Sequence, residues 1–122
     1  MSVLIHFEIA ADRLDRAVKF YRNVFGWKIE KLEESEEYWY VTTDDGEELA
    51  VTGGLFERGH TVDSTINTFD VPSLDSAAKK ITESGGKVLA PKISLTGLGY
   101  VQYCQDSEGN TFGIMEYDES AA

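Results

Sequence analysis

The sequence predicts an α+β fold of two tandem βαβββ modules, which would form a partly closed mixed sheet around a cavity. The first observation is an internal repeat: with an offset of 60 residues, IHFEIAADRLDRAVKF from Ile5 aligns with TINTFDVPSLDSAAKK from Thr65. The second is that the later elements also repeat if the register slips by three, so that DGEELAV from Asp45 meets EGNTFGI from Glu108. Because one unit alone would expose a sheet face, two units are best joined around a shared concavity.

The first module, about residues 1–52, is expected to begin with a strand at 3–9. Asp12 is the predicted cap of a helix whose apolar residues follow the helical period, and Gly26 is the predicted end of that helix. Strands are predicted at 27–32, 38–43 and 47–52, and the last two are joined by a hairpin turn at Asp45 and Gly46. Residues 53–64 have no clear period and are expected to link the modules.

The second module, about residues 65–118, repeats this order within a single domain of 122 residues. A strand at 65–71 is followed by a helix at 74–84, which Ser73 is expected to cap and Gly85 and Gly86 to end. Strands are then predicted at about 87–95, 100–105 and 110–117.

Composition limits the class of partner. The net charge of −11 repels phosphate backbones and anionic lipid surfaces, so we expect no nucleic acid and no membrane partner. The chain shows neither a signal peptide nor a stretch of apolar residues long enough to span a bilayer, and we expect a cytoplasmic protein. The single cysteine, Cys104, is consistent with a reducing compartment and is expected to be a buried strand residue.

Three segments resemble a known family: HFEIAADRLDRAVKFYRNVFGW near the start, GGKVLAPK at 85–92 and DSEGNTFGIMEYD near the end. Together they are similar to the vicinal oxygen chelate superfamily, also called the glyoxalase, bleomycin resistance and extradiol dioxygenase group. This superfamily includes metal-dependent lyases, isomerases and dioxygenases, and also metal-free proteins that sequester a drug. The resemblance therefore implies a fold and a place for the site, and the chemistry depends on the side chains found there.

Metal-dependent members place ligands on the first and fourth strand of each module. Here His6 matches the first of these positions, and the two alignments carry the others to Ile66, Ala50 and Gly113, which offer no side-chain lone pair. Because a stable transition-metal site needs at least three protein ligands, we expect no metal and no other cofactor. In a different register, Glu8 or Glu48 could complete such a site.

His6 and Glu8 are the catalytic candidates. Both are expected to face the cavity, where the carboxylate could set the tautomer of the imidazole and raise its affinity for a proton. The alternative is that His6 is a hydrogen-bonded structural residue. His60 is expected to be an exposed residue of the linker.

Strand alternation predicts the side chains that line the cavity. Small residues would leave space there, aromatic and acidic ones would suit a planar or cationic ligand, and Gly113→Leu should block the site without unfolding the chain. In the other register, Trp39 would replace its two tyrosine neighbours, and all three could instead be core or dimer contacts. Phe112 and Ile114 are assigned to the core. The predicted ligand-binding residues are Tyr38, Tyr40, Glu48, Ala50, Thr52, Ile66, Thr68, Gly113 and Met115.

Two main functions remain. The favoured one is a metal-free glyoxalase-like or bleomycin-resistance-like protein that binds a small organic molecule in the sheet cavity and forms a homodimer. The alternative is a divalent-metal-dependent lyase, isomerase or dioxygenase. A regulatory domain with no ligand is a third possibility, and the sequence leaves open whether any catalysis occurs.

Overall fold

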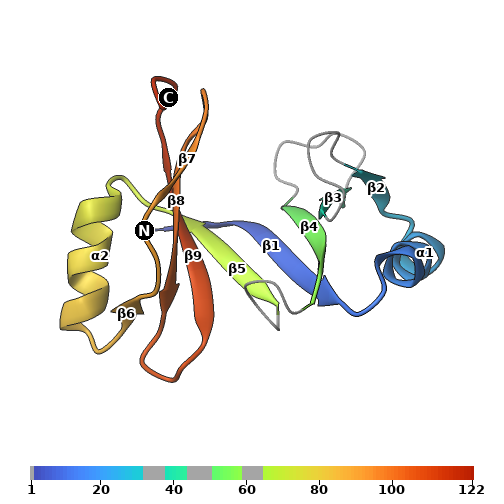
Figure 1. The fold of residues 1–122 in the computed structure, drawn as a ribbon, viewed down its shortest axis with the longest axis horizontal. Helices are drawn as coiled ribbons and strands as arrows, with labels where there is room; N and C mark the ends of the chain where they lie inside the picture. The colour runs from blue at the N-terminus through green and yellow to red at the C-terminus, as the bar shows by residue number, and fades with distance from the viewer. Residues whose placement is uncertain (1, 32–37, 44–50, 59–64) are drawn as a thin grey trace. The chain divides into compact units, whose positions relative to one another are not determined.

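The computed structural model describes residues 2–31, 38–43, 51–58 and 65–122, and the chain divides into two compact units. The first unit is residues 6–66, and the second is residues 67–122 together with residues 1–5. Each unit packs one helix on a mixed sheet, as Figure 1 shows. The predicted α+β fold with two tandem modules is confirmed.

In the first unit the described strands are ordered β2-β3-β4-β1. β1 runs parallel to β4, and the other neighbours are antiparallel. The first two residues of β1 belong to the second unit. The elements are β1 (Leu4–Ala11), α1 (Leu14–Phe25), β2 (Lys28–Lys31), β3 (Tyr38–Thr42) and β4 (Thr52–Glu57).

In the second unit the order is β5-β9-β8-β6, and β7 also pairs with β8, although Ile66, the first residue of β5, belongs to the first unit. Here β5 runs parallel to β9, as β1 does to β4 in the first unit. The predicted strand at 87–95 is two short strands separated by Pro91, which has no N–H to donate to a ladder. The elements are β5 (Ile66–Asp70), α2 (Leu74–Glu83), β6 (Lys87–Val88), β7 (Ile93–Leu95), β8 (Gly99–Gln105) and β9 (Thr111–Tyr117).

Each helix covers its own apolar core. Val18 of α1 packs with buried strand residues Ile29, Val41 and Leu55. In the second unit the core is formed by buried Leu74, Cys104 and Ile114, against which Phe112 packs. The core assignments of Phe112 and Ile114 and the burial of Cys104 are therefore confirmed.

Two of the predicted helix signals are confirmed. Gly26 adopts a left-handed conformation with φ of 70°, and its N–H donates to the carbonyl of Arg22. At the start of α2 the Ser73 hydroxyl accepts a hydrogen bond from the N–H of Ser76 at 3.2 Å. Neither described helix has the length and apolar character needed to cross a bilayer.

The predicted cap of α1 is wrong. The capping position is Arg13, whose side chain makes no capping hydrogen bond. The Asp12 carboxylate instead accepts a hydrogen bond from Nε of Arg58 at 2.8 Å. Because Arg58 lies directly after β4, this ion pair joins the ends of two parallel strands.

The position of β4 also corrects the sequence prediction. A strand was expected at 47–52 and a linker at 53–64, but β4 begins at Thr52 and continues to Glu57. The pair Gly53 and Gly54 indicated a loop, although both are needed within the strand. A side chain at Gly53 would overlap the Phe7 ring, and one at Gly54 would overlap Tyr38. Residues 44–50 and 59–64, which include Asp45, Gly46 and His60, lie outside the described residues.

The observed position of β4 changes the alignment of the two copies of the internal repeat. The segment TGGLFE of β4 aligns with TFGIME of β9 at an offset of 59 residues, so the expected slip of three is wrong. The strand pairing agrees, because Gly54 pairs with Glu8 and Gly113 pairs with Thr68. The equivalent of Gly113 in the first unit is therefore Gly54, and not Ala50.

Candidate functional site

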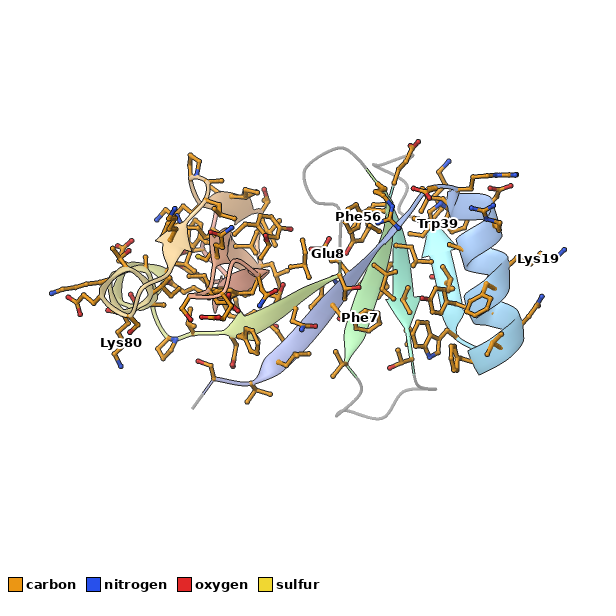
Figure 2. The ribbon with its side chains drawn as sticks, turned by 90° about the horizontal axis from the view of Figure 1, so that it is seen from below. Phe7, Glu8, Lys19, Trp39, Phe56 and Lys80 are labelled. Atoms are coloured by element: carbon orange, nitrogen blue, oxygen red, sulfur yellow. The ribbon has the colours of Figure 1, made fainter. Side chains whose placement is uncertain are left out.

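The face of the first sheet that turns away from α1 carries the candidate side chains. The period of two along β1 sends Phe7 and Ile9 to the core under α1 and His6 and Glu8 to the other side. In Figure 2, Trp39 lies between its strand and α1, whereas Glu8 lies on the opposite side of the sheet. We call this opposite side the His6 face.

The same alternation decides the register of β3. Trp39 packs against the buried core, with the Arg22 guanidinium 6.0 Å from its ring centroid. Its neighbours Tyr38 and Tyr40 therefore belong to the His6 face. Of the two registers allowed by the sequence, the structure has the one with the two tyrosines on this face.

Hydroxyl groups hold both nitrogens of the His6 ring. Nδ1 lies 2.9 Å from Oγ1 of Thr52, and Nε2 lies 2.9 Å from Oη of Tyr38. Thr52 is the direct strand partner of His6 in the parallel pair β1 and β4. The ring is thus held by one residue of β4 and one of β3, and it remains only partly buried.

Gly54 makes the contact with Tyr38 possible. Tyr38 is on β3 and His6 on β1, and β4 runs between these two strands. The phenol reaches across β4 over Gly54, where any side chain would overlap its hydroxyl. Sequence reasoning missed Gly54 because it placed this residue in a linker, although the repeated T-x-G-x-x-E pattern of β4 and β9 could have identified it.

Tyr40 completes the cluster. Its ring is stacked beside that of His6, with centroids 6.4 Å apart and an angle of 26° between the planes. Tyr40 is itself partly buried and pairs directly with Gly54. The His6 face therefore presents three partly buried rings, of His6, Tyr38 and Tyr40, and three hydroxyl groups, of Tyr38, Tyr40 and Thr52.

Burial lowers the pKa of His6 below its ordinary value. The imidazole is consequently neutral at pH 7, with one nitrogen that donates and one that accepts. We expected the Glu8 carboxylate to set the tautomer and raise the proton affinity of the ring. This expectation is wrong, because the hydroxyls of Thr52 and Tyr38 contact both ring nitrogens and desolvation dominates the pKa.

The other predicted ligand-binding residues are either buried or outside the described residues. Ile66, Thr68, Gly113 and Met115 are buried, so they offer no open surface. Gly113 was expected to leave space, but a side-chain carbon there would lie 2.7 Å from Oγ1 of Thr68. Glu48 and Ala50 lie outside the described residues.

A resident divalent metal does not fit the residues that are described. His6 is a possible nitrogen ligand, but both its nitrogens already contact hydroxyls. Ile66 has no lone pair, and Gly54 and Gly113 stand at the positions on the fourth strands. Among residues 2–31, 38–43, 51–58 and 65–122, no three His, Cys, Asp or Glu side chains gather closely enough to hold an ion. A transition-metal site would need at least two more ligands than His6 supplies.

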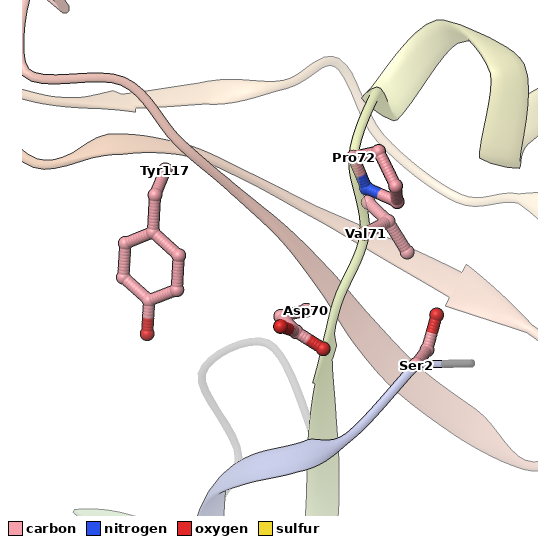
Figure 3. A pocket seen from close by; sticks show the side chains of 5 residues that line it. All are labelled: Ser2, Asp70, Val71, Pro72 and Tyr117. Atoms are coloured by element: carbon pink, nitrogen blue, oxygen red, sulfur yellow. The ribbon is translucent and has the colours of Figure 1, made fainter.

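A separate hollow of about 320 Å³ lies within the second unit, where sequence analysis did not predict one. Figure 3 shows the Asp70 carboxylate between Tyr117 and Ser2, with Val71 and Pro72 along one side. One Asp70 oxygen accepts a hydrogen bond from the Val3 N–H at 2.7 Å. The carboxylate therefore has a structural role in holding the N-terminal residues.

The two repeated units, each with its first strand parallel to a later one, define a two-module α+β class of protein. The model of the Glyoxalase/Bleomycin resistance protein/Dioxygenase superfamily matches residues 3–114, and the chain belongs to this superfamily. The resemblance found in the sequence is thereby confirmed.

Individual proteins show the same relationship. A glyoxylase-like domain-containing protein from Didymella fabae is 29% identical over 123 residues, with 88% of each chain covered. A methylmalonyl-CoA epimerase from Streptomyces coelicolor, solved with 2-nitronate-propionyl-CoA, has a TM-score of 0.68 at 19% identity and covers 100% of this chain and 99% of its own. A superfamily member from Vibrio splendidus 12B01 has a TM-score of 0.67 at 16% identity, with 95% and 99% covered. At these identities the solved structures establish the shared fold alone.

Proposed function

We propose that this chain is a metal-free member of its superfamily that binds a small, flat, neutral or cationic organic molecule on the His6 face. The observation that carries the proposal is the arrangement around His6. Two hydroxyls, each 2.9 Å from a ring nitrogen, fix the imidazole, and the Tyr40 ring stacks beside it. Fixed rings and oriented hydroxyls lower the entropy lost when a ligand is ordered against them.

The rings favour a flat ligand. His6 and Tyr40 are both partly buried, so each has a side fixed by the protein and a part open to solvent. A planar ligand can stack on such rings, and an aromatic pair contributes about 0.5–1.5 kcal/mol beyond the burial of its surface.

The charges of this face disfavour an anion. Glu8 lies two residues from His6 on the same side of β1, and His6 is neutral at pH 7 because burial lowers its pKa. The whole chain carries a net charge of −11. An anionic ligand would approach against this field, and no cationic side chain stands beside His6 on this face among the described residues, whereas a cation would be attracted.

Three probes that share one flat ring test the charge preference: indole, the cation tryptamine and the anion indole-3-acetate. Saturation-transfer NMR should rank binding as tryptamine, then indole, then indole-3-acetate. In protein-observed NMR spectra, the largest chemical-shift changes should be those of His6 and Tyr40. Tyr40→Ala should weaken binding of all three probes, whereas Tyr117→Ala in the second unit serves as the matched control. Strongest binding by indole-3-acetate, or equal binding by the Tyr40→Ala variant, would contradict the proposal.

The metal-free part of the proposal has its own test. It is supported by Gly54, Ile66 and Gly113 at the positions where metal-dependent relatives would need ligands. Elemental analysis of untagged protein should find no zinc, nickel, iron or manganese in stoichiometric amount. One metal ion per chain that is lost in His6→Ala would favour the metal-dependent lyase, isomerase or dioxygenase instead.

A further inference from the structure

We infer that Tyr38 and His6 form a proton relay, in which the Tyr38 hydroxyl takes a proton from a bound carbon acid while its own proton passes to His6. The inference rests on the proposed function, because it assigns chemistry to the same ligand site. It requires no metal. Tyr38 would be the catalytic residue, and His6 the positioning residue that acts through it.

The two hydroxyls around His6 differ as proton donors. A phenol has a pKa near 10, whereas an aliphatic hydroxyl is far less acidic. The more acidic group is the better donor to the free lone pair of a neutral imidazole. We therefore assign the Tyr38 O–H as donor to Nε2, with Nδ1–H donating to Oγ1 of Thr52, and both contacts measure 2.9 Å.

The Nδ1–H tautomer of His6 determines that the proton moves from Tyr38 to His6. With Nδ1 protonated, the lone pair of Nε2 points at the phenol proton that it would receive. The pKa of His6 is lowered by burial, so the ring is in the accepting neutral form at pH 7. Among the described residues, the titratable groups on this face near His6 are Glu8 on β1 and Tyr38 and Tyr40 on β3, because β4 contributes Thr52, Gly54 and Phe56.

The second copy of the repeat, which begins at Ile66, shows that the fold itself does not require the pair of Tyr38 and His6. By the strand pairings, Tyr38 lies opposite Phe56, and its counterpart Val101 lies opposite Met115. The counterpart of His6 is the buried Ile66. The second copy therefore keeps the same framework with the aliphatic residues Val101 and Ile66 at these two positions. Packing alone does not account for the phenol hydrogen-bonded to an imidazole in the first copy.

The fitting substrate class is a neutral, flat ketone with a C–H bond next to the carbonyl group. The Tyr38 O–H bond breaks as an N–H bond forms at Nε2 of His6. The phenolate oxygen forms a new O–H bond to the ligand hydrogen, and the electron pair of the broken C–H bond remains on the ligand as an enolate. The reverse steps return a proton to carbon, so atoms and electrons balance without an oxidant or reductant.

The first test uses the ligand-free protein with ¹⁵N-labelled histidine. At neutral pH the His6 signals should show a protonated Nδ1 and an unprotonated Nε2, and Tyr38→Phe should remove the hydrogen bond at Nε2. A proton found on Nε2 would overturn the relay, because His6 could not then accept the proton of Tyr38.

The second test measures hydrogen exchange at the benzylic carbon of phenylacetone in deuterium oxide by proton NMR. Wild-type protein should accelerate the exchange over buffer, and Tyr38→Phe and His6→Gln should each lose about 100-fold of that acceleration. Tyr117→Phe, the same change at an exposed tyrosine, should match the wild type. The wild-type rate should fall as the pH falls through the lowered pKa of His6, and the His6→Gln rate should not follow this profile.

The outcomes separate the two proposals. If phenylacetone shifts the His6 and Tyr40 signals but exchanges only at the buffer rate, the relay is wrong and the binding site stands. If phenylacetone leaves those signals unchanged, binding of a neutral flat ligand is contradicted, and the histidine tautomer alone then decides the relay. Folding of each variant is checked by its amide NMR spectrum.

Discussion

The two units of the molecule share a framework and differ in polarity. We compare six equivalent positions around the candidate site, of which three carry the same residue in both copies of the repeat and three carry different ones. The shared pairs are Thr52 and Thr111, Gly54 and Gly113, and Tyr40 and Tyr103. The pairs that differ are His6 and Ile66, Glu8 and Thr68, and Tyr38 and Val101.

This difference separates what the fold needs from what a site needs. In both units a side chain from a neighbouring strand covers the strand glycine: Tyr38 covers Gly54, and Thr68 covers Gly113. The glycine is therefore a requirement of sheet packing. At the three positions that differ, histidine, glutamate and tyrosine occur only in the first copy of the repeat, which places the candidate chemistry there.

The largest expected effect on stability comes from placing a side chain at either Gly54 or Gly113. Gly54→Leu and Gly113→Leu should each lower the free energy of unfolding by about 1–3 kcal/mol, because the covering side chain must move. This corrects the expectation that leucine at Gly113 fills only an open hollow, since Thr68 already occupies that space. Urea denaturation measures both changes.

Double variants identify the covering group. Tyr38→Ala should relieve much of the cost of Gly54→Ala, and Thr68→Ala should relieve that of Gly113→Ala. Strict additivity in either pair would show that the cover has been assigned to the wrong residue.

A reciprocal exchange should be unequal. Ile66→His would bury a polar ring at a site that is 1% exposed, with an expected cost of about 1–3 kcal/mol if the ring finds no partner. His6→Ile removes two hydrogen bonds at a partly exposed site and should cost only about 1 kcal/mol. Thermal and urea unfolding of both variants test the order, and a larger loss from His6→Ile would contradict it.

At the equivalent positions His6 and Ile66, only His6 should make the stability of the fold depend on pH. The pKa of His6 is lowered in the folded chain, so between the folded and unfolded pKa values the unfolded chain binds more protons. Stability is therefore full above the ordinary histidine pKa and declines as the pH falls through it towards the folded value. His6→Gln should reduce this decline in urea midpoints measured from pH 7.5 to 5, and an unchanged decline would assign it to other groups.

The smallest effect is expected in assembly. Both units expose apolar side chains, and those of α1 include two aromatic ones, Phe20 and Phe25, each more than half exposed. We expect a homodimer that uses this helix, so Phe25→Glu should weaken it and Leu98→Glu in the second unit should not. Light scattering at tens of micromolar protein gives the mass of each, and a monomer mass for the wild type would contradict the expectation.

The sequence predicted the fold well where one pattern dominated. The periods of the two helices, the left-handed Gly26 and the Ser73 cap were sufficient to place α1 and α2. The pair Gly53 and Gly54 misled because glycine usually marks a turn. Only the side chains of Phe7 and Tyr38, which lie over these residues, make glycine necessary inside β4.

The candidate site was predictable only in part. Alternation placed His6, Tyr38, Tyr40 and Thr52 as candidates, and the structure brings these four together. The reach of Tyr38 across β4 depends on a diagonal contact between strands that are not neighbours, which no local pattern encodes. Likewise, alternation gives the side on which Thr68 lies but not whether another side chain covers it.

The grouping of residues 1–5 with the second unit has a consequence for synthesis of the chain. Val3 and Asp70 exchange two hydrogen bonds across a separation of 67 residues. At about 5–20 residues per second on the ribosome, Val3 waits roughly 3–13 s before its partner has even been made. The segment around Val3 is therefore made several seconds before its hydrogen-bonding partner, and during that time its backbone groups are unpaired with Asp70.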